Sequence, residues 1–174
     1  MAKETISILI ADDNREFCET LKDFLQQQDG FELTGIAHNG MEAVEYIEQT
    51  RPDVVVLDII MPHLDGIGVL EKLAANQTGH RPKIIMLTAF GQQNITHRAV
   101  ELGADYYILK PFDLSVLATR IRQLADGVSV TPYVAAAKEK NLDVAVTNII
   151  HEMGVPTRIR QLADGVSVTP YVAA

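Results

Sequence analysis

Polar and charged side chains follow four apolar runs of the sequence: Asp12-Asp13, Asp58, Thr88 and Lys110. Three carboxylates gathered in one place can all stay ionised only if a cation neutralises them. Oxygen ligands without histidine or cysteine suit a hard divalent ion, so Mg²⁺ (or Mn²⁺ or Ca²⁺) is the expected cofactor. With a lysine beside the ion, such a site can hold a phosphoryl group.

Asp58 is the best candidate for the carboxylate that accepts the phosphoryl group. It ends the apolar run Val54–Leu57, where an ionised side chain is costly unless something compensates its charge. The Asp12-Asp13 pair is placed to hold metal, which leaves Asp58 to act as a nucleophile. We therefore expect the metal and Lys110 to compensate the Asp58 carboxylate.

These residues can meet only if the apolar runs form one sheet. Residues 1–126 alternate five strand-like runs with five segments of helical spacing. The strands are expected at 6–11, 31–37, 54–57, 83–87 and 105–109. This alternation predicts an α/β fold with a five-stranded parallel sheet, doubly wound, with helices on both faces. In such a sheet, ligands bind at the carboxyl ends of the strands, where the candidate residues lie.

Composition excludes several classes of protein. The net charge of −8 over 174 residues argues against a surface that grips nucleic acid throughout. A single cysteine, Cys18, rules out a disulfide framework or a cysteine-based zinc site. No apolar run reaches membrane-spanning length, and residues 1–5 lack the features of a signal peptide. The chain is therefore expected to be cytoplasmic, without a membrane partner.

Each motif also has a purely structural interpretation. An aspartate pair after a strand often caps a helix, and Thr88 alone is more often a cap than a switch. Tyr107 alone is most simply explained by core packing, and Asp65-Gly66 by a turn and a helix start. Only the joint placement at successive strand ends favours a chemical role.

Together the motifs resemble the receiver domain of two-component response regulators. The residues that carry this resemblance are Asp12-Asp13, Asp58 with Met61-Pro62 and Asp65-Gly66, Thr88-Ala89, and Lys110-Pro111-Phe112. The resemblance implies a flavodoxin-like receiver fold over residues 1–126. More closely, ISILIADDNREFCETL and KNLDVAVTNIIHEMGVP resemble the sporulation response regulators of endospore-forming bacteria, which are transcription regulators.

The resemblance also implies roles for single residues. Asp58 would be the phosphoacceptor, and Asp12, Asp13 and the backbone carbonyl of Ile60 would join it in holding Mg²⁺. Lys110 would contact the phosphoryl oxygens. Such a chain is a signalling phosphoacceptor, not an enzyme with a separate substrate.

The same resemblance implies a switch and a phosphodonor. Thr88 would hydrogen-bond the new phosphoryl group, and Tyr107 would change rotamer as Thr88 shifts. The bond between Lys110 and Pro111 would be cis. A histidine kinase or histidine phosphotransferase would supply the phosphoryl group, and its arrival would change conformation or dimerisation.

The last part of the sequence departs from that pattern. We expect a linker at 127–140 and the first helix of an effector domain at 141–156, a short helical appendage to the receiver. Residues 157–174 then repeat residues 119–136 without a change. The DNA-binding part is therefore expected to be incomplete, so that DNA would be a partner only of a complete effector domain.

The repeat also suggests a homodimer formed by exchange of the last receiver helix, because Thr157–Asp164 duplicates the second half of that helix. Two other functions stay open from the sequence. One is an intact DNA-binding transcription regulator, and the other is an oligomerisation module that does not respond to phosphate.

Overall fold

The computed structural model describes residues 5–76, 79–89, 93–128, 157–162 and 165–170. Its main unit is a five-stranded parallel sheet with the strand order β2-β1-β3-β4-β5. The strands are β1 Ile6–Ala11, β2 Phe31–Ala37, β3 Val54–Asp58, β4 Lys83–Ala89 and β5 Tyr106–Lys110. The helices between and after them are α1 Arg15–Gln26, α2 Gly40–Thr50, α3 Gly66–Ala75, α4 Gln93–Glu101 and α5 Leu114–Ala125.

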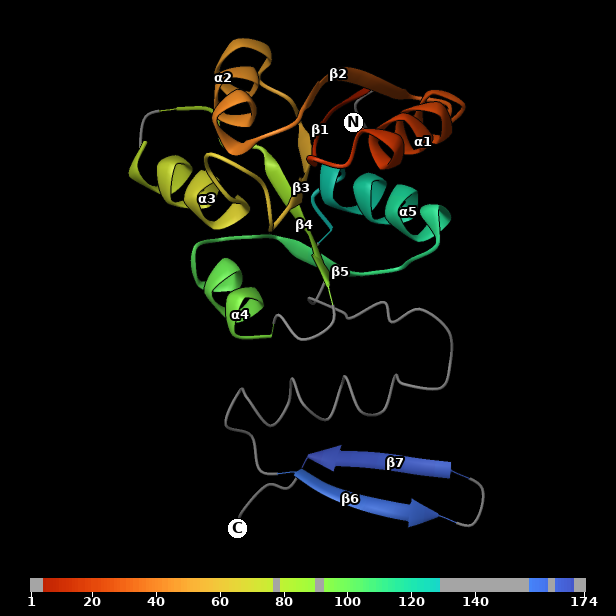
Figure 1. The fold of residues 1–174 in the computed structure, drawn as a ribbon. Coiled ribbons are helices and arrows are strands. Elements are labelled where there is room, and N and C mark those ends of the chain that lie inside the picture. The colour runs from red at the N-terminus through yellow and green to blue at the C-terminus, as the bar shows by residue number, and fades with distance from the viewer. Residues whose placement is uncertain (1–4, 77–78, 90–92, 129–156, 163–164, 171–174) are drawn as a thin grey trace.

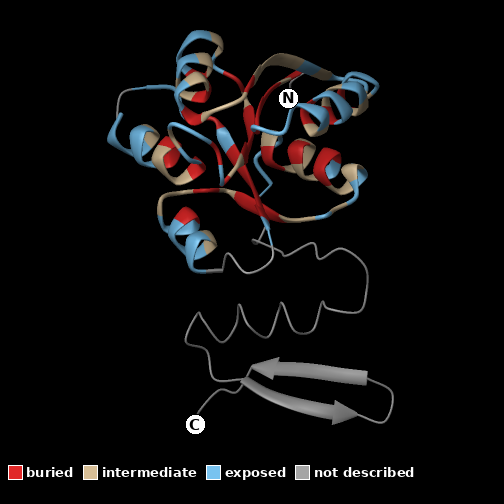
Figure 2. Cartoon of the chain, in the orientation of Figure 1, coloured by how far each residue is buried: buried red, intermediate tan, exposed pale blue. Residues whose placement is uncertain are grey.

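The helices cover both faces of the sheet, with α1 and α5 on one side and α2, α3 and α4 on the other (Figure 1). Side chains alternate along each strand, so a central strand must be apolar on both faces. In β3, Val54 and Val56 pack into the core beside α1 and α5, while Val55 and Leu57 pack into the opposite core. Buried residues therefore concentrate in the strands and on the inner sides of the helices (Figure 2).

Side-chain caps begin four of the helices close to the strand ends. The Oδ1 atom of Asn14, two residues after Asp12, accepts the N–H of Phe17 at 3.0 Å and caps α1. Asn39, Asp65 and Asp113 cap α2, α3 and α5 in the same way. Asp65 thus has the structural role expected from the sequence. The caps therefore fix where these four helices begin.

Helix α3 starts in close contact with the end of β3. The N–H of Gly66 donates to the carbonyl of Ile59 at 2.8 Å. A Cβ atom on Gly66 would lie 2.4 Å from the Asp58 carbonyl oxygen, closer than any side chain tolerates. Glycine at this position therefore lets the helix hold the loop that follows Asp58.

The predicted fold is confirmed, with small differences at element ends. Strand β4 extends through Thr88 to Ala89, and Lys110 is the last residue of β5, whereas both were expected just beyond their strands. The Lys110-Pro111 bond is cis, as the resemblance implied. Among the described residues, no helix combines the length and apolar character needed to cross a membrane.

A separate antiparallel hairpin forms from the repeated segment, with β6 Thr157–Leu162 and β7 Gly165–Pro170. Residues 157–162 have the same sequence as residues 119–124, which are helical in α5. Six identical residues therefore form a helix in one place and a strand in the other, because tertiary context overrides local propensity. The helix expected at 141–156 lies outside the described residues, as does most of the 127–140 linker.

We predict that Gly66→Ala lowers the free energy of unfolding by about 1 to 3 kcal/mol, because the added methyl collides with the backbone at Asp58. Gly68→Ala in the same helix is the matched control. Its methyl would collide with the Leu64 side chain, which can rotate away, and would lie at an ordinary contact distance of 3.4 Å from Oδ1 of Asp65, so it meets no backbone atom. Urea unfolding of both variants checks this, and equal losses of stability would contradict the proposed backbone collision.

Candidate functional site

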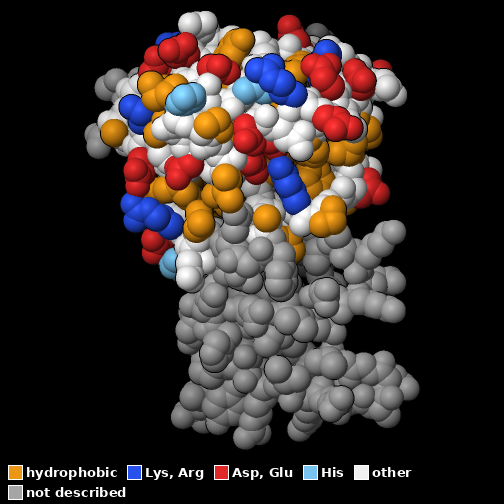
Figure 3. All heavy atoms as spheres, in the orientation of Figure 1, with side chains coloured by type: hydrophobic (Ala, Val, Ile, Leu, Met, Phe, Trp, Pro, Cys, Tyr) orange, Lys and Arg blue, Asp and Glu red, His pale blue; other side chains and the backbone are white. Residues whose placement is uncertain are grey.

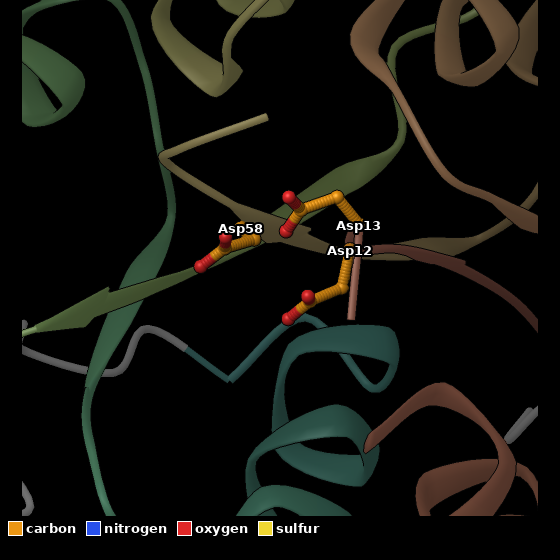
Figure 4. A group of neighbouring side chains, drawn as sticks. All are labelled: Asp12, Asp13 and Asp58. Atoms are coloured by element: carbon orange, nitrogen blue, oxygen red, sulfur yellow. The ribbon is translucent and has the colours of Figure 1, made fainter. Parts of the chain in front are cut away.

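The three aspartates meet where β1 and β3 end (Figure 4). These strands are neighbours, and their register pairs Ala11 with Leu57, so the residues that follow on β1 lie beside Asp58. One carboxylate oxygen from each of Asp12, Asp13 and Asp58 lies within 4.8 Å of the others. Asp12 is almost fully buried, whereas Asp13 is exposed. The sequence prediction that these acids converge therefore agrees with the geometry.

Lys110 supplies the positive charge nearest to the acids. Its Nζ atom donates to Oδ2 of Asp12 at 2.7 Å and lies 3.3 Å from Oδ1 of Asp58. Strand β4 separates β5 from β3 in the sheet, so a long side chain is needed to reach the acids from β5. The lysine therefore joins the ends of three strands at one point.

One ammonium does not balance three carboxylates, and the pKa of Asp58 reflects this. Burial and then the negative charge of Asp12 raise the pKa of Asp58 to about 6, against an ordinary value of 3.8, although Lys110 offsets part of the effect. For Lys110, burial lowers the pKa, but its hydrogen bond with Asp12 and the charge of Asp58 outweigh burial and leave it above the ordinary value. The cluster thus holds excess negative charge.

The arrangement fits a hard divalent cation. All of its side-chain ligands are carboxylate oxygens, which Mg²⁺ and Ca²⁺ prefer, and two or three of them with water complete such sites. Asp12 is held in place because its Oδ1 atom accepts the N–H of Asn14 at 2.9 Å. The ligand role of the Ile60 carbonyl stays a prediction, while the preceding carbonyl of Ile59 already accepts a hydrogen bond from Gly66.

Thr88 and Tyr107 lie in the neighbouring strands β4 and β5, and Leu87, the residue before Thr88, pairs with Asp58 in the sheet. Thr88 is buried near the end of β4, and its Oγ1 atom lies 3.3 Å from Oγ1 of Thr96 in α4. Tyr107 is buried in the core beside α2, α3 and α4, where burial raises the pKa of its hydroxyl. The core-packing interpretation of Tyr107 therefore has direct support, and the switch roles of both residues stay predictions.

Two neighbours of the site were not predicted from the sequence. The ring of Phe17 lies beneath the Lys110 ammonium, with 4.6 Å between Nζ and the ring centroid. The Nδ1 atom of His38 lies 3.1 Å from the carbonyl oxygen of Asp12. No local pattern marks Phe17, because its contact joins a helix to the end of a strand more than 90 residues away in the sequence.

Comparison with known proteins gives one matching family model. The model of the response regulator receiver domain matches residues 8–122. This interval contains β2, β3, β4 and β5, all of β1 except its first two residues, and every candidate site residue.

Solved structures give the same result. The Francisella response regulator 1452 receiver domain is 29% identical, with a TM-score of 0.64, and the match covers 71% of this chain and 98% of that one. The response regulator domain of Thermotoga maritima CheB is 30% identical, with a TM-score of 0.63, and the match covers 74% of this chain and 99% of that one. The signal receiver domain of the putative response regulator NarL from Mycobacterium tuberculosis is 25% identical, with a TM-score of 0.67 and coverage of 72% and 99%.

We predict that Asp58→Asn raises the free energy of unfolding of the metal-free protein by about 1 to 3 kcal/mol at pH 7.5. A carboxyl whose pKa rises on folding, here to about 6, binds its proton more tightly in the folded chain. Its ionised form therefore opposes folding above that pH. The gain in unfolding free energy of Asp58→Asn over the wild type should shrink as the pH falls toward 3.8, the ordinary pKa of an aspartate.

Denaturant unfolding at several pH values, with a chelator present, checks this prediction. Asp23→Asn, which changes an exposed acid of α1, is the matched control and should have little effect. Added Mg²⁺ should stabilise the wild type more than the Asp58→Asn chain. A variant that is less stable than the wild type at pH 7.5 would contradict the excess negative charge described above.

Proposed function

The chain belongs to the response regulator receiver domain family, and on that basis we propose that it is a phosphorylation switch with Asp58 as phosphoacceptor. The observation that supports this most is the convergence of three carboxylates and one ammonium at the carboxyl edge of the sheet. A structural ion pair needs only one acid for one lysine, and the additional acids bring a charge that a cation must offset.

In the proposed reaction, a carboxylate oxygen of Asp58 attacks the phosphorus of a phosphohistidine on a partner. A bond from that oxygen to phosphorus forms, the phosphorus–nitrogen bond breaks, and the histidine nitrogen leaves with the electron pair. With a pKa of about 6, Asp58 is ionised in most molecules above pH 7 and ready to attack. Lys110, already 3.3 Å from Asp58, neutralises charge on the transferred oxygens.

Asp12, Asp13, Asp58 and the Ile60 carbonyl would hold Mg²⁺, which neutralises charge on the carboxylates and phosphoryl oxygens when bound. The buried Asp12 has a fixed carboxylate, while the exposed Asp13 leaves one side of the site open to water and phosphodonor.

Thr88 and Tyr107 form the proposed output of the switch. The Thr88 hydroxyl contacts Thr96 in α4, so its movement toward a phosphoryl group on Asp58 would give up that contact. Tyr107 would then take the space that Thr88 leaves. Phosphorylation would in this way change the position of α4, which packs against α3 through the Arg98–Glu71 ion pair.

The expected phosphodonor is a histidine kinase or a histidine phosphotransferase. The finer identification, a sporulation regulator acting in the cytoplasm, rests on the two sequence stretches quoted above and stays part of this proposal. DNA binding by an intact regulator is the second candidate function. On the face drawn in Figure 3, basic side chains are interspersed with acidic and apolar ones, which offers DNA no continuous basic surface there.

The repeated segment supports a second copy of the chain as a further partner. In α5, Ile121 and Leu124 are buried, and Arg122 lies over the Phe31 ring. Residues 157–162 carry the same apolar and basic side chains, and a two-stranded hairpin is only marginally stable on its own. We propose that this segment of one chain can replace the second half of α5 in another chain, which would link two copies.

We predict that a small phosphodonor such as acetyl phosphate adds one phosphoryl group to the chain, and that Mg²⁺ is required. Intact-mass analysis measures the addition, and hydroxylamine should remove the group because it cleaves acyl phosphates. Asp58→Asn should abolish the addition and Lys110→Ala should slow it by about tenfold or more, while Asp23→Asn should leave it unchanged. A phosphoryl group retained in the Asp58→Asn chain would rule out the proposed acceptor.

The exchange predicts a mass that rises with concentration in light scattering of the full chain. Replacing both Ile159 and Leu162 by Asp should return the chain to a monomer, because their counterparts in α5 are buried. Thr157→Asp is the matched control, since its counterpart Thr119 is exposed. A wild-type chain that stays monomeric at every concentration would refute the exchange.

A further inference from the structure

Phe17 lies where α1 meets the end of β5. The Asn14 cap fixes the first turn of α1, and the buried Cys18 and Leu21 orient the helix against the sheet. This orientation leaves Phe17 half-buried, with its ring 4.6 Å from Nζ of Lys110. The electron-rich face of an aromatic ring attracts a cation within about 6 Å of its centroid. The distance is therefore that of a favourable cation–π contact.

A second ring holds Phe17 in this position. The Phe112 ring lies edge-on to it, with centroids 6.2 Å apart and an angle of 83° between the planes. Edge-to-face geometry is a favourable arrangement for two aromatic rings. Because Phe112 follows Lys110 by two residues, the chain just after β5 supplies the ring that restrains Phe17 beneath the lysine.

The ring differs in kind from the other neighbours of the ammonium. Those neighbours in the described chain are oxygens of Asp12 and Asp58, which the proposed function also assigns to the metal and the phosphoryl group. A cation bound to these carboxylates would compete with Lys110 for their negative charge. The Phe17 ring attracts the ammonium without being a ligand for a hard metal ion.

We propose that Phe17 is a positioning residue, which keeps the Lys110 ammonium at the edge of the sheet while its carboxylate partners bind metal and phosphoryl group. This inference rests on the proposed function and deepens it, because it names a residue outside the charged cluster on which the transfer rate depends. A leucine at this position would fill similar space without a ring face to attract the ammonium.

The test compares the full-length wild type with three variants. Phe17→Leu removes the ring, whereas Phe17→Tyr keeps an aromatic face at this position. Phe24→Leu is the matched control, because Phe24 is also a partly buried residue of α1 that packs against the same core. The rate of phosphoryl incorporation is measured with acetyl phosphate and Mg²⁺, and urea unfolding shows that each variant is folded.

A second readout needs neither metal nor phosphodonor. Protons above an aromatic ring are shifted upfield in NMR spectra, so the ε-methylene signal of Lys110 should be shifted in the wild type. The shift should disappear in Phe17→Leu and persist in Phe17→Tyr and Phe24→Leu.

We expect Phe17→Leu to slow incorporation by about 3- to 10-fold, with Phe17→Tyr and Phe24→Leu within about 2-fold of the wild type. An unchanged rate in Phe17→Leu, or an equal loss in Phe24→Leu, would overturn the positioning role. A wild type that takes up no phosphoryl group would instead refute the proposed function. An unshifted ε-methylene signal of Lys110 in the wild type would overturn the cation–π contact itself.

Discussion

The repulsion among three carboxylates at one edge of the sheet is the interaction on which the account depends. One carboxylate oxygen from each of Asp12, Asp13 and Asp58 lies within 4.8 Å of the others, and Lys110 is the ammonium that contacts two of these residues. Burial first, and then the negative charge of Asp12, raise the pKa of Asp58. A site of this kind gains from binding a divalent cation and, with it, a transferred phosphoryl group.

The rest of the fold keeps these charges together. Two apolar cores, one on each face, fix the sheet, and the pairing of β1 with β3 determines which residues end side by side. Gly66 allows α3 to contact the backbone at Asp58, and Asn14 holds both Asp12 and the start of α1. The charge repulsion at this edge is tolerated because the two packed cores stabilise the sheet and keep the strand ends together.

The sequence predicted those parts of the structure that depend on local pattern. Apolar runs and helical spacing located the strands and helices, and the rule for parallel sheets placed Asp12, Asp58 and Lys110 together. The sequence did not reveal that Phe17 contacts Lys110, because a contact between a helix and the end of a distant strand depends on how α1 is rotated about its axis. Nor could it assign residues 157–162, since the same six letters form a helix at 119–124 and a strand here. Local propensity does not decide between such states when tertiary contacts differ.

The most direct test is to locate a bound divalent ion by NMR, with Mn²⁺ added in small amounts to the ¹⁵N-labelled chain. We predict that amide signals of Asp13, Asp58 and Ile60 broaden first, because the ion would bind at the carboxyl ends of β1 and β3. Signals near Asp53 and Asp105, acids close to the amino ends of strands, should stay sharp. Broadening centred on those acids, or spread evenly over the acidic surface, would contradict the site and the function proposed from it.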